Sequence, residues 1–445
     1  MNGKSLNYQD VIAYLFDRLP MYQRVGKSAY KSNLDTTLAL DEYFGHPHRT
    51  FKSIHIAGTN GKGSVAHMLS SILQSAGYRV GLYTSPHLTN FRERIRIDGK
   101  MIPEERVTEF VNRHREVVEE LQPSFFEMTV AMAFDFFSKE EVDYAVIETG
   151  MGGRLDSTNI IQPMVSVITN IGFDHSQFLG DTIYKIAVEK AGIIKRGIPV
   201  VIGETQEEAR LVFSRIARER GCSIIYADKE FQVTYSTQSL KQTQIIHISR
   251  TNGHKLDSIE TDLMGLYQQK NVVTVLAVIG LLATIGPDIV EKDIRQGLAR
   301  TRTLTGLRGR WETIGYNPLI ICDTGHNREG IAEIMKQIRQ TPWKNLHFVL
   351  GLVDDKDPSG ILEQLPAEAV YYFTQSSVPR AMDREKLAAE ALRYGLYGQV
   401  CPTPQKALKI ALSKADQEDL IFLGGSTFVV AEVLENSVSL KDNKE

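Results

Sequence analysis

The chain has 445 residues, and 51 Lys and Arg stand against 54 Asp and Glu, which gives a formal net charge of −3. At roughly 150 residues per domain this length suggests two or three domains, and 42% apolar with 24% charged residues is the composition of a globular protein with full cores. These values exclude a mostly disordered chain. The near-neutral charge also argues against nucleic acid as a partner, because nucleic-acid binding depends on clustered Lys and Arg.

Three features bear on the cellular compartment. The cysteines Cys222, Cys322 and Cys401 are odd in number and far apart, so neither a disulfide framework nor a cysteine-based zinc site is expected. The first ten residues are polar and lack the apolar stretch of a signal peptide. The longest uncharged run, residues 271–287, has 17 residues, and a membrane span needs about 20. We therefore expect a buried core helix there, and a cytoplasmic protein with no membrane partner.

The first periodic unit of the chain follows residue 50. Residues 51–57 alternate as a strand does, and a glycine-rich turn follows at residues 58–64. Apolar side chains then recur at helical spacing over residues 65–76, and residues 79–84 are typical of a second strand. Strand, turn, helix and strand in this order predict the βαβ unit of a parallel sheet.

The rest of the first 298 residues continues this alternation. The buried strands of the same sheet are expected at residues 144–149, 165–170 and 199–203, and the main helices at residues 107–121 and 126–138. Residues 231–262 differ, because they are rich in Thr, Gln and Ser, alternate apolar with polar residues, and contain an Asn252-Gly253 turn. This pattern predicts a small antiparallel meander.

A second α/β region follows a basic, loop-like stretch at residues 299–309, which we predict to be a linker. Short apolar runs again alternate with helical patterns beyond it. The strands of this region are expected at residues 319–323, 346–351, 370–374 and 420–423. The predicted fold class is therefore α/β with two domains: residues 1–298, with a mostly parallel sheet and the antiparallel meander, and residues 310–445.

The glycine-rich turn at residues 58–64 reads GTNGKGS and lies between a strand and a helix, the context in which such a turn binds phosphate. Glycines let backbone N–H groups approach an anion, the helix N-terminus adds partial positive charge, and Lys62 supplies a full charge. The pattern departs from G-x-x-x-x-G-K-[ST], because its first glycine comes two residues late and Gly63 stands where a metal-binding hydroxyl normally follows the lysine. A plain glycine-rich turn is the alternative. The flanking strand and amphipathic helix favour nucleotide phosphate binding.

Three polar residues at other strand ends are candidate metal ligands. Ser85 follows the second strand, Glu148 ends the strand of residues 144–149, and His175 comes soon after the strand of residues 165–170. Because parallel strands deliver their carboxyl ends to one crevice, we expect all three beside the phosphate turn. A carboxylate in that position is suited to Mg²⁺. The alternatives are a turn serine, a surface acid and a structural histidine.

Ten short motifs occur in series along nearly the whole chain: GTNGKGS, TSPHL, ETGMGGRLDSTN, TNIGFDHSQFLG, EKAGIIK, the region of Asn271, LRGRW, DTGHN, DDKD and GGSTFVVAEVL. In their order and spacing the sequence resembles the folylpolyglutamate synthase / dihydrofolate synthase family, within the wider group of Mur-type ATP-dependent amide ligases. Gly63 also favours the folate branch, since the cell-wall ligases carry a Thr after the lysine. DTGHN departs mildly from the family, with Gly325 and Arg328 where Ala and Pro are commoner.

The resemblance implies a fold and a nucleotide site. Residues 1–298 would form a Mur-ligase-like central ATP-binding domain of the phosphate-loop type, and residues 310–445 a Rossmann-like ligase domain. The implied ATP contacts come from both domains: Thr59, Asn60, Gly61, Lys62, Gly63, Ser64, Asn271, Arg310, Asp323 and His326.

The resemblance also implies the metal and substrate contacts. Ser85 and Glu148 would hold a first Mg²⁺, and Glu148 and His175 a second. Lys190 falls at the position where the family carries a carbamylated lysine, an adduct that turns a cation into an anion facing the metals. With Lys62, Glu148 and His175 it completes the implied catalytic set. The positions that match the pterin pocket are Phe126, Glu127, Arg154, Asp156 and Ser157.

The implied activity is ATP-dependent ligation of L-glutamate to dihydropteroate, to the γ-carboxylate of folate glutamates, or to both, through an acyl phosphate and with release of ADP and phosphate. The expected partners are these small molecules, including reduced folates, and a monomer is the family-like default. Two alternatives stay open. One is a cell-wall Mur-type ligase acting on a nucleotide-sugar peptide. The other is a phosphate-loop nucleotide switch, which would need a base-reading motif and a hydroxyl next to Lys62, and the sequence shows neither.

Overall fold

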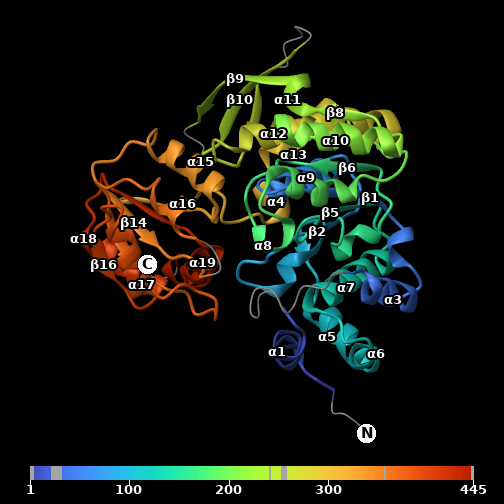
Figure 1. Ribbon diagram of the computed structural model, residues 1–445, viewed down its shortest axis with the longest axis horizontal. Coiled ribbons are helices and arrows are strands. Elements are labelled where there is room, and N and C mark those ends of the chain that lie inside the picture. The colour runs from blue at the N-terminus through green and yellow to red at the C-terminus, as the bar shows by residue number, and fades with distance from the viewer. Residues whose placement is uncertain (1–4, 22–32, 240–241, 252–257, 355–356, 442–445) are drawn as a thin grey trace. The chain divides into compact units, whose positions relative to one another are not determined.

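A computed structural model describes residues 5–21, 33–239, 242–251, 258–354 and 357–441 (Figure 1). The chain forms two compact units. Unit 1 comprises Met1–Asp262 and Gln268–Leu307, and unit 2 comprises Leu263–Tyr267 and Arg308–Glu445. The two-unit α/β organisation agrees with the prediction, except that the short segment Leu263–Tyr267 belongs with the second unit.

Unit 1 is built around an eight-stranded sheet in the order β4-β3-β2-β5-β1-β6-β7-β8. Its strands are β1 (Lys52–Ala57), β2 (Val80–Tyr83), β3 (Ile95–Ile97), β4 (Lys100–Met101), β5 (Tyr144–Glu148), β6 (Val165–Ile168), β7 (Val200–Ile202) and β8 (Ile224–Tyr226). The strands from β2 to β8 in this order are parallel, and β3 and β4 add an antiparallel edge. The carboxyl ends of β2, β5, β1 and β6 therefore share one edge of the sheet.

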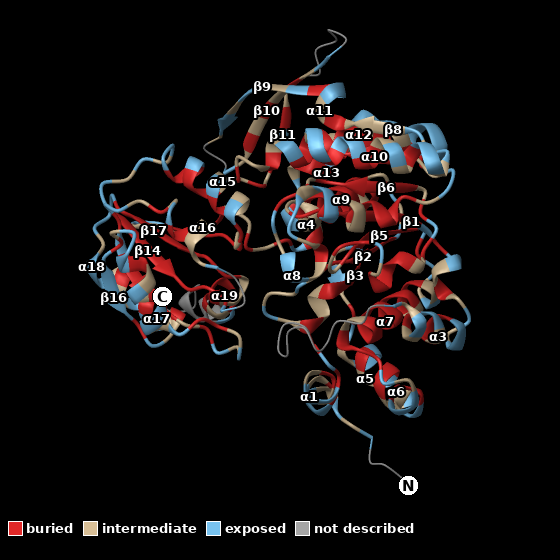
Figure 2. Ribbon diagram, in the orientation of Figure 1, coloured by how far each residue is buried: buried red, intermediate tan, exposed pale blue. Residues whose placement is uncertain are grey.

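The helices of unit 1 confirm the predicted βαβ start, because a helix connects β1 to β2. They are α1 (Tyr8–Arg18), α3 (Asp35–Tyr43), α4 (Lys62–Ser75), α5 (Glu104–Arg113), α6 (Arg115–Leu121), α7 (Phe125–Lys139), α8 (Ser176–Leu179), α9 (Ile183–Lys190), α10 (Glu207–Arg220), α11 (Ala227–Glu230), α12 (Gln268–Ile285), α13 (Glu291–Ala299) and α14 (Thr301–Thr305). Figure 2 shows that buried residues concentrate in the sheet strands and on the helix faces that meet them.

Helix α12 is the buried core helix expected at residues 271–287. It packs against α4 and against strands β6 and β7. Among the described residues it is the one helix whose length and composition would let it cross a membrane, yet 61% of that window is buried inside the structure. A single, mostly buried helix of this kind is weak evidence for a membrane span.

Two segments of unit 1 differ from the sequence-based expectation. The helix predicted at residues 107–121 is broken at His114. The His114 ring packs on Phe110, and its Nδ1 shares a hydrogen bond of 3.0 Å with the Tyr43 hydroxyl. The stretch predicted as a linker, residues 299–309, is mostly helical instead. Buried Thr305 of α14 bonds His67 of α4 over 2.8 Å, so tertiary contacts fix a segment whose composition suggests a loop.

Helices α4 and α13 approach each other closely at Gly297. A Cβ on this residue would come within 2.6 Å of the Ile72 Cα, and the Ser71 hydroxyl donates a hydrogen bond of 2.7 Å to the Gly297 carbonyl. Backbone atoms cannot rotate away as a side chain can. The packing of these two helices therefore requires glycine at this position.

Replacing Gly297 with alanine is expected to destabilise the protein by about 1–3 kcal/mol, because the added methyl overpacks a backbone contact. Gly280 is the matched control, since it also lies in a helix but a Cβ there would meet no atom within 4 Å. Gly280→Ala should be neutral or stabilise by up to about 1 kcal/mol through helix propensity. Urea unfolding of both variants tests this contrast, and equal stabilities would contradict the close approach of α4 and α13.

The remaining elements of unit 1 form the predicted antiparallel meander. Its strands are β9 (Phe231–Gln238), β10 (Gln244–Arg250) and β11 (Ile259–Thr261), in the order β11-β10-β9. The Asn252-Gly253 turn expected there lies outside the described residues.

Unit 2 holds a six-stranded sheet in the order β12-β13-β17-β14-β15-β16, with β12 antiparallel at one edge. Its strands are β12 (Glu312–Gly315), β13 (Leu319–Cys322), β14 (Leu346–Leu350), β15 (Val370–Phe373), β16 (Gly398–Val400) and β17 (Leu420–Gly424). Its helices are α15 (Arg328–Ile338), α16 (Ser359–Leu362), α17 (Arg384–Leu392), α18 (Pro404–Lys414) and α19 (Thr427–Lys441). All four strands predicted for the second domain are present, and β14 and β17 are buried throughout.

Candidate active site

The turn between β1 and α4 is shaped by two glycines. Gly58 and Gly61 have φ values of +147° and +85°, and a Cβ would come within 1.8 Å of the Thr169 Oγ1 and 2.3 Å of the Asn271 Oδ1, respectively. The Thr169 hydroxyl donates a hydrogen bond of 2.6 Å to the Asn60 carbonyl. The sequence therefore needs glycine at both positions to bring this turn against the ends of β6 and α12.

The N-terminus of α4 presents free backbone donors. The first intrahelical bond joins the Val65 N–H to the Gly61 carbonyl over 2.9 Å. Within the described part of the chain, the N–H groups of Lys62, Gly63 and Ser64 donate to no protein acceptor. These groups, with the positive end of the helix dipole, form an anion-binding arrangement.

Two lysine ammonium groups lie against this turn. The Lys62 Nζ donates a hydrogen bond to the Thr59 carbonyl over 3.1 Å, and the Lys190 Nζ donates to the Gly58 carbonyl over 2.7 Å. Lys190, which ends α9, is only 4% exposed. Burial, and then the positive charge of Lys62, lower the pKa of Lys190 to about 7 against the opposing effects of Asp174 and Asp156. Lys190 is thus a buried amine beside the phosphate turn.

Glu148 ends β5, the strand between β1 and β2, and is 4% exposed. Its Oε2 accepts a hydrogen bond of 3.1 Å from the backbone N–H of Ser85, which follows β2. The structure thus brings Glu148 and Ser85 together at the same sheet edge as Lys62. The strand order and this hydrogen bond thus place the ends of β5 and β2 next to the turn that follows β1.

His175 follows β6 on the other side of β1. It has φ +51° and stands at the start of α8, and its backbone N–H donates to the Asp174 Oδ1 over 2.9 Å. Left-handed backbone is uncommon for a residue that is not glycine, and His is one of the residue types that adopt it more readily. Among the described residues no three His, Cys, Asp or Glu side chains gather into a metal site. Any metal at this edge would therefore need ligands besides these protein groups.

The start of α12 lies beside the phosphate turn. The Gln268 amide donates to the Ser64 hydroxyl over 3.2 Å, and the Asn271 amide donates to the Gln268 Oε1 over 2.8 Å. Asn271 is also the residue against which Gly61 packs. The predicted nucleotide residues Ser64 and Asn271 are therefore in one hydrogen-bonded group. Gln268, which the sequence did not single out, connects them.

A buried arginine lies near Glu148. The Arg94 Nε donates to the His87 Nδ1 over 2.8 Å, and the guanidinium lies 5.2 Å from the centroid of the Phe125 ring. Burial lowers the pKa of Arg94, while the charges of Tyr83 and Glu148 act to raise it. Arg94 thus places a cation close enough to interact with the Glu148 carboxylate. Arg94 and Glu148 are 54 positions apart in the sequence, so no local pattern indicated that they would interact.

The predicted pterin residues occupy structural positions near this edge. Phe126 packs against Gly150, where a Cβ would come within 2.5 Å of its ring, and lies 6.0 Å from the Tyr83 ring centroid. Glu127 closes the capping box of α7 by accepting from the Ser124 N–H over 2.7 Å. The pattern S-x-x-E at Ser124 and Glu127 predicts this capping box from the sequence, whereas the family resemblance places Glu127 at the pterin pocket.

The remaining pterin candidates come from the loop after β5. The Asp156 carboxylate caps the short helix Ser157–Ile160 and accepts hydrogen bonds from Met151 N–H and Thr158. Burial raises the pKa of Asp156 despite these bonds. Arg154 pairs with Glu189 over 2.8 Å, and Ser157 is buried. These residues shape the loop, and the described contacts do not assign them a ligand.

In unit 2, Asp323 is the centre of a buried network. Its Oδ2 accepts from the Tyr267 hydroxyl over 2.5 Å and from the Trp311 N–H over 2.7 Å, and its Oδ1 accepts from the Gly325 N–H over 2.7 Å. Burial raises the pKa of Asp323, although the Tyr267 hydrogen bond and the Arg310 charge oppose it. Tyr267 explains why its short segment belongs with unit 2.

Arg310 and His326 flank Asp323 in this unit. The Arg310 guanidinium donates to the Thr324 hydroxyl and to the Gly309 carbonyl, the latter over 3.1 Å. The His326 Nδ1 lies 2.9 Å from the Thr324 carbonyl. The three residues predicted from the second domain thus meet around Thr324.

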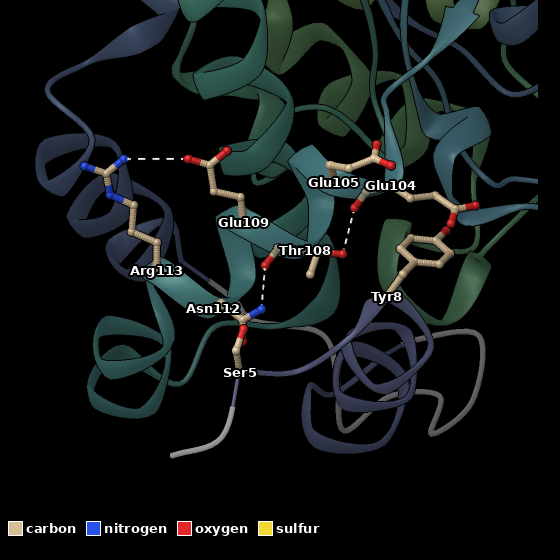
Figure 3. Close-up of a pocket in the computed structure, with 8 residues that line it drawn as sticks. All are labelled: Ser5, Tyr8, Glu104, Glu105, Thr108, Glu109, Asn112 and Arg113. Carbon is tan, nitrogen blue, oxygen red and sulfur yellow. Dashed lines mark hydrogen bonds and ion pairs between the residues drawn. The ribbon is translucent and has the colours of Figure 1, made fainter. Parts of the chain in front are cut away.

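A wide groove of unit 1 lies apart from all of these residues. It measures about 710 Å³ and is lined by Ser5, Tyr8, Glu104, Glu105, Thr108, Glu109, Asn112 and Arg113. Figure 3 shows these side chains along α5 and the start of the chain, with Glu109 facing Arg113. None of the predicted site residues lines this groove.

Comparison with known proteins agrees with this division of the chain. Residues 56–279 match the Mur ligase middle domain, and residues 309–427 match the Mur ligase glutamate ligase domain. A Bacillus subtilis relative named dihydrofolate synthase/folylpolyglutamate synthase is 32% identical over 437 residues, which cover 96% of this chain and 98% of that protein.

Two further comparisons extend this finding. A Haloferax volcanii protein named probable bifunctional folylpolyglutamate synthase/dihydropteroate synthase is 32% identical over 96% of this chain, and the match spans 50% of that longer protein. The solved structure of E. coli FolC in complex with DHPP and ADP has a TM-score of 0.85 and 26% identity, with 98% of this chain and 99% of that chain covered.

Proposed function

Because the chain belongs to the folylpolyglutamate synthase / dihydrofolate synthase family of Mur ligases, we propose that it joins L-glutamate to dihydropteroate and to the γ-carboxylate of folate glutamates. It is an ATP-dependent ligase of that family. The observation that best supports an ATP site in this chain is the turn at Gly58–Gly61. Free N–H donors of α4 and the Lys62 ammonium meet there at the strand ends that carry Glu148 and Ser85.

The chemistry explains why a ligase needs this arrangement. A carboxylate is a poor electrophile, so the γ-phosphoryl group of ATP first bonds to a carboxylate oxygen of the acceptor, and ADP leaves. The glutamate amine then attacks the acyl carbon, the C–O bond to phosphate breaks, and the amine loses a proton. Charge on the transferring phosphoryl oxygens is the main obstacle. Lys62 and the N–H groups of Lys62, Gly63 and Ser64 are placed to balance it.

The donor set at the strand ends fits Mg²⁺. Glu148 offers a carboxylate and Ser85 a hydroxyl, the oxygen ligands that a hard divalent cation prefers, and His175 adds a nitrogen. Mg²⁺ commonly takes only one or two carboxylates and completes its shell with water and substrate phosphates, which suits a site with few acidic groups. When bound, the metal would neutralise and orient phosphoryl oxygens. The Arg94 cation would also attract the Glu148 carboxylate electrostatically.

Lys190 meets the chemical requirement for carbamylation. Carbon dioxide adds only to a neutral amine, and burial beside Lys62 lowers the pKa of Lys190 to about 7. A far larger fraction of this amine is therefore neutral near pH 7 than the fraction below about 0.001 of an ordinary lysine. The carbamate would carry negative charge and could face a metal at Glu148.

Labelling with ¹³C-bicarbonate tests this proposal by NMR. The wild-type protein should show a carbamate resonance whose intensity falls as pH drops below about 7, by up to tenfold per unit, because protonation removes the reactive amine. Lys190→Arg should lack it, and Lys185→Arg, on the exposed side of the same helix, should retain it. An unchanged spectrum in Lys190→Arg would remove the carbamate from this position.

The acceptor specificity is tested with purified protein, ATP, glutamate and one acceptor at a time. We expect ADP and a product one glutamate heavier with dihydropteroate and with tetrahydrofolate, resolved by mass. Product only with UDP-linked peptides would favour a cell-wall ligase, and phosphate release that no acceptor stimulates would favour a nucleotide switch. A monomer in the cytoplasm, using ATP with two Mg²⁺ ions, is the working arrangement we propose.

A further inference from the structure

A second cavity of unit 1 lies at the opposite ends of the parallel strands from the candidate active site. It measures about 360 Å³ and is lined by Gln162, Lys195, Arg196, Glu219 and Arg220. Gln162 precedes β6, and Lys195 and Arg196 precede β7. The cavity is therefore near the amino ends of these parallel strands, whereas the phosphate turn lies at their carboxyl ends.

Three basic side chains line this cavity, and most of their N–H groups donate no hydrogen bond to the described part of the protein. The Lys195 Nζ donates to the Asn159 carbonyl over 2.6 Å, and the Arg220 guanidinium donates to the Ile194 carbonyl. Arg196 is exposed, and within the described residues its guanidinium makes neither a hydrogen bond nor an ion pair. A lysine has three N–H donors and an arginine five, so most of the donors here are unused by the protein.

The charges of the lining are unbalanced. Three cations face one acid, Glu219, which leaves 3 − 1 = +2. The Glu219 carboxylate is 4.0 Å from Arg215, a residue outside the lining, and has no ion pair with the three cavity cations. Burial lowers the pKa of Lys195 to about 8, and the positive charge of Arg220 adds to this effect. The fold thus holds three cations around a cavity whose one acid, Glu219, pairs with Arg215 outside the lining.

We propose that this cavity binds a phosphate group, as inorganic phosphate or as the head of a phosphate monoester. The planar fork of an arginine matches the oxygens of a phosphate, and two arginines with a lysine are a typical set for that ligand. A dianion would balance the net charge of +2 of the lining. It would also accept hydrogen bonds from the donors that Arg196, Arg220 and Lys195 leave free.

Isothermal titration with inorganic phosphate tests the site. The protein is first saturated with Mg²⁺ and a non-hydrolysable ATP analogue, so that the candidate active site cannot bind the added phosphate. Arg196→Glu should weaken phosphate binding by about tenfold or more, because it reverses one of the charges around the ligand. Since Arg196 has no partner in the described residues, this variant should melt at the wild-type temperature.

Arg218→Glu is the matched control. It makes the same change in net charge at an exposed arginine in the last turn of α10, near Arg220, but Arg218 does not line the cavity. Its phosphate affinity should stay within about twofold of wild type. Tighter binding of glycerol phosphate than of inorganic phosphate would identify a monoester as the ligand, and the reverse order would identify free phosphate. No saturable binding to the wild-type protein, or equal weakening in both variants, would overturn the site.

Discussion

Replacing Lys62 with alanine is expected to lower kcat by about 10³-fold or more, equivalent to about 4 kcal/mol of transition-state stabilisation. The lysine ammonium lies over the phosphate turn, where its Nζ bonds the Thr59 carbonyl, and it brings the charge that the transferring phosphoryl group needs. The fold should persist, because Lys62 is half-buried at the start of α4 and alanine favours helix. Steady-state ATP turnover with an acceptor and glutamate gives the measurement.

Lys292→Ala is the control for this variant. Lys292 is an exposed lysine in the first turn of α13, so it shares the loss of charge but not the position. Its kcat should equal that of the wild type. A Lys62→Ala enzyme with kcat within about twofold of wild type would refute the role of this turn in phosphoryl transfer.

Replacing Glu148 with glutamine is expected to raise the Mg²⁺ concentration needed for half-maximal activity by about tenfold or more, because an amide cannot replace the charge of a carboxylate on a divalent cation. The glutamine oxygen can still accept the hydrogen bond from the Ser85 N–H, so the turn after β2 should keep its place. A Mg²⁺ titration of the reaction rate is the measurement.

Glu105→Gln provides the comparison for Glu148→Gln, because Glu105 is an exposed acid on α5 and the substitution is the same. Its Mg²⁺ titration should overlay that of the wild-type enzyme. If the Glu148→Gln titration also overlays it, Glu148 is not a metal ligand.

Much of the fold could be predicted because the buried strands are continuous apolar runs. Residues 144–148 and 165–168 are buried along their whole length, which is why apolar residues dominate their sequences. The edge strands β3 and β4 have too few residues for a period to appear. Helix α14 was mistaken for a loop because its threonines bond α4 and α13, and no local pattern reports such contacts.

The sequence predicted those parts of the candidate site where the backbone geometry allows only one residue type. Gly58 and Gly61 are required because the backbone there approaches Thr169 and Asn271 closely. The glycine-rich motif indicated from the sequence alone that the backbone turns tightly here. The supporting contacts were not readable. Gln268 and Arg94 come from distant parts of the chain, and only the tertiary fold brings them to the site. The lowered pKa of Lys190 likewise depends on burial that only the fold creates.

The transfer of ¹⁸O from the acceptor to phosphate tests the central claim most directly. Dihydropteroate labelled with ¹⁸O in both carboxylate oxygens is incubated with the wild-type protein, ATP and glutamate. The ¹⁸O content of the released phosphate is then measured by mass spectrometry. If ATP activates the carboxylate, one ¹⁸O remains in the amide and the other leaves in each phosphate. Phosphate that carries only solvent or ATP oxygen, while the amide forms, would contradict the account.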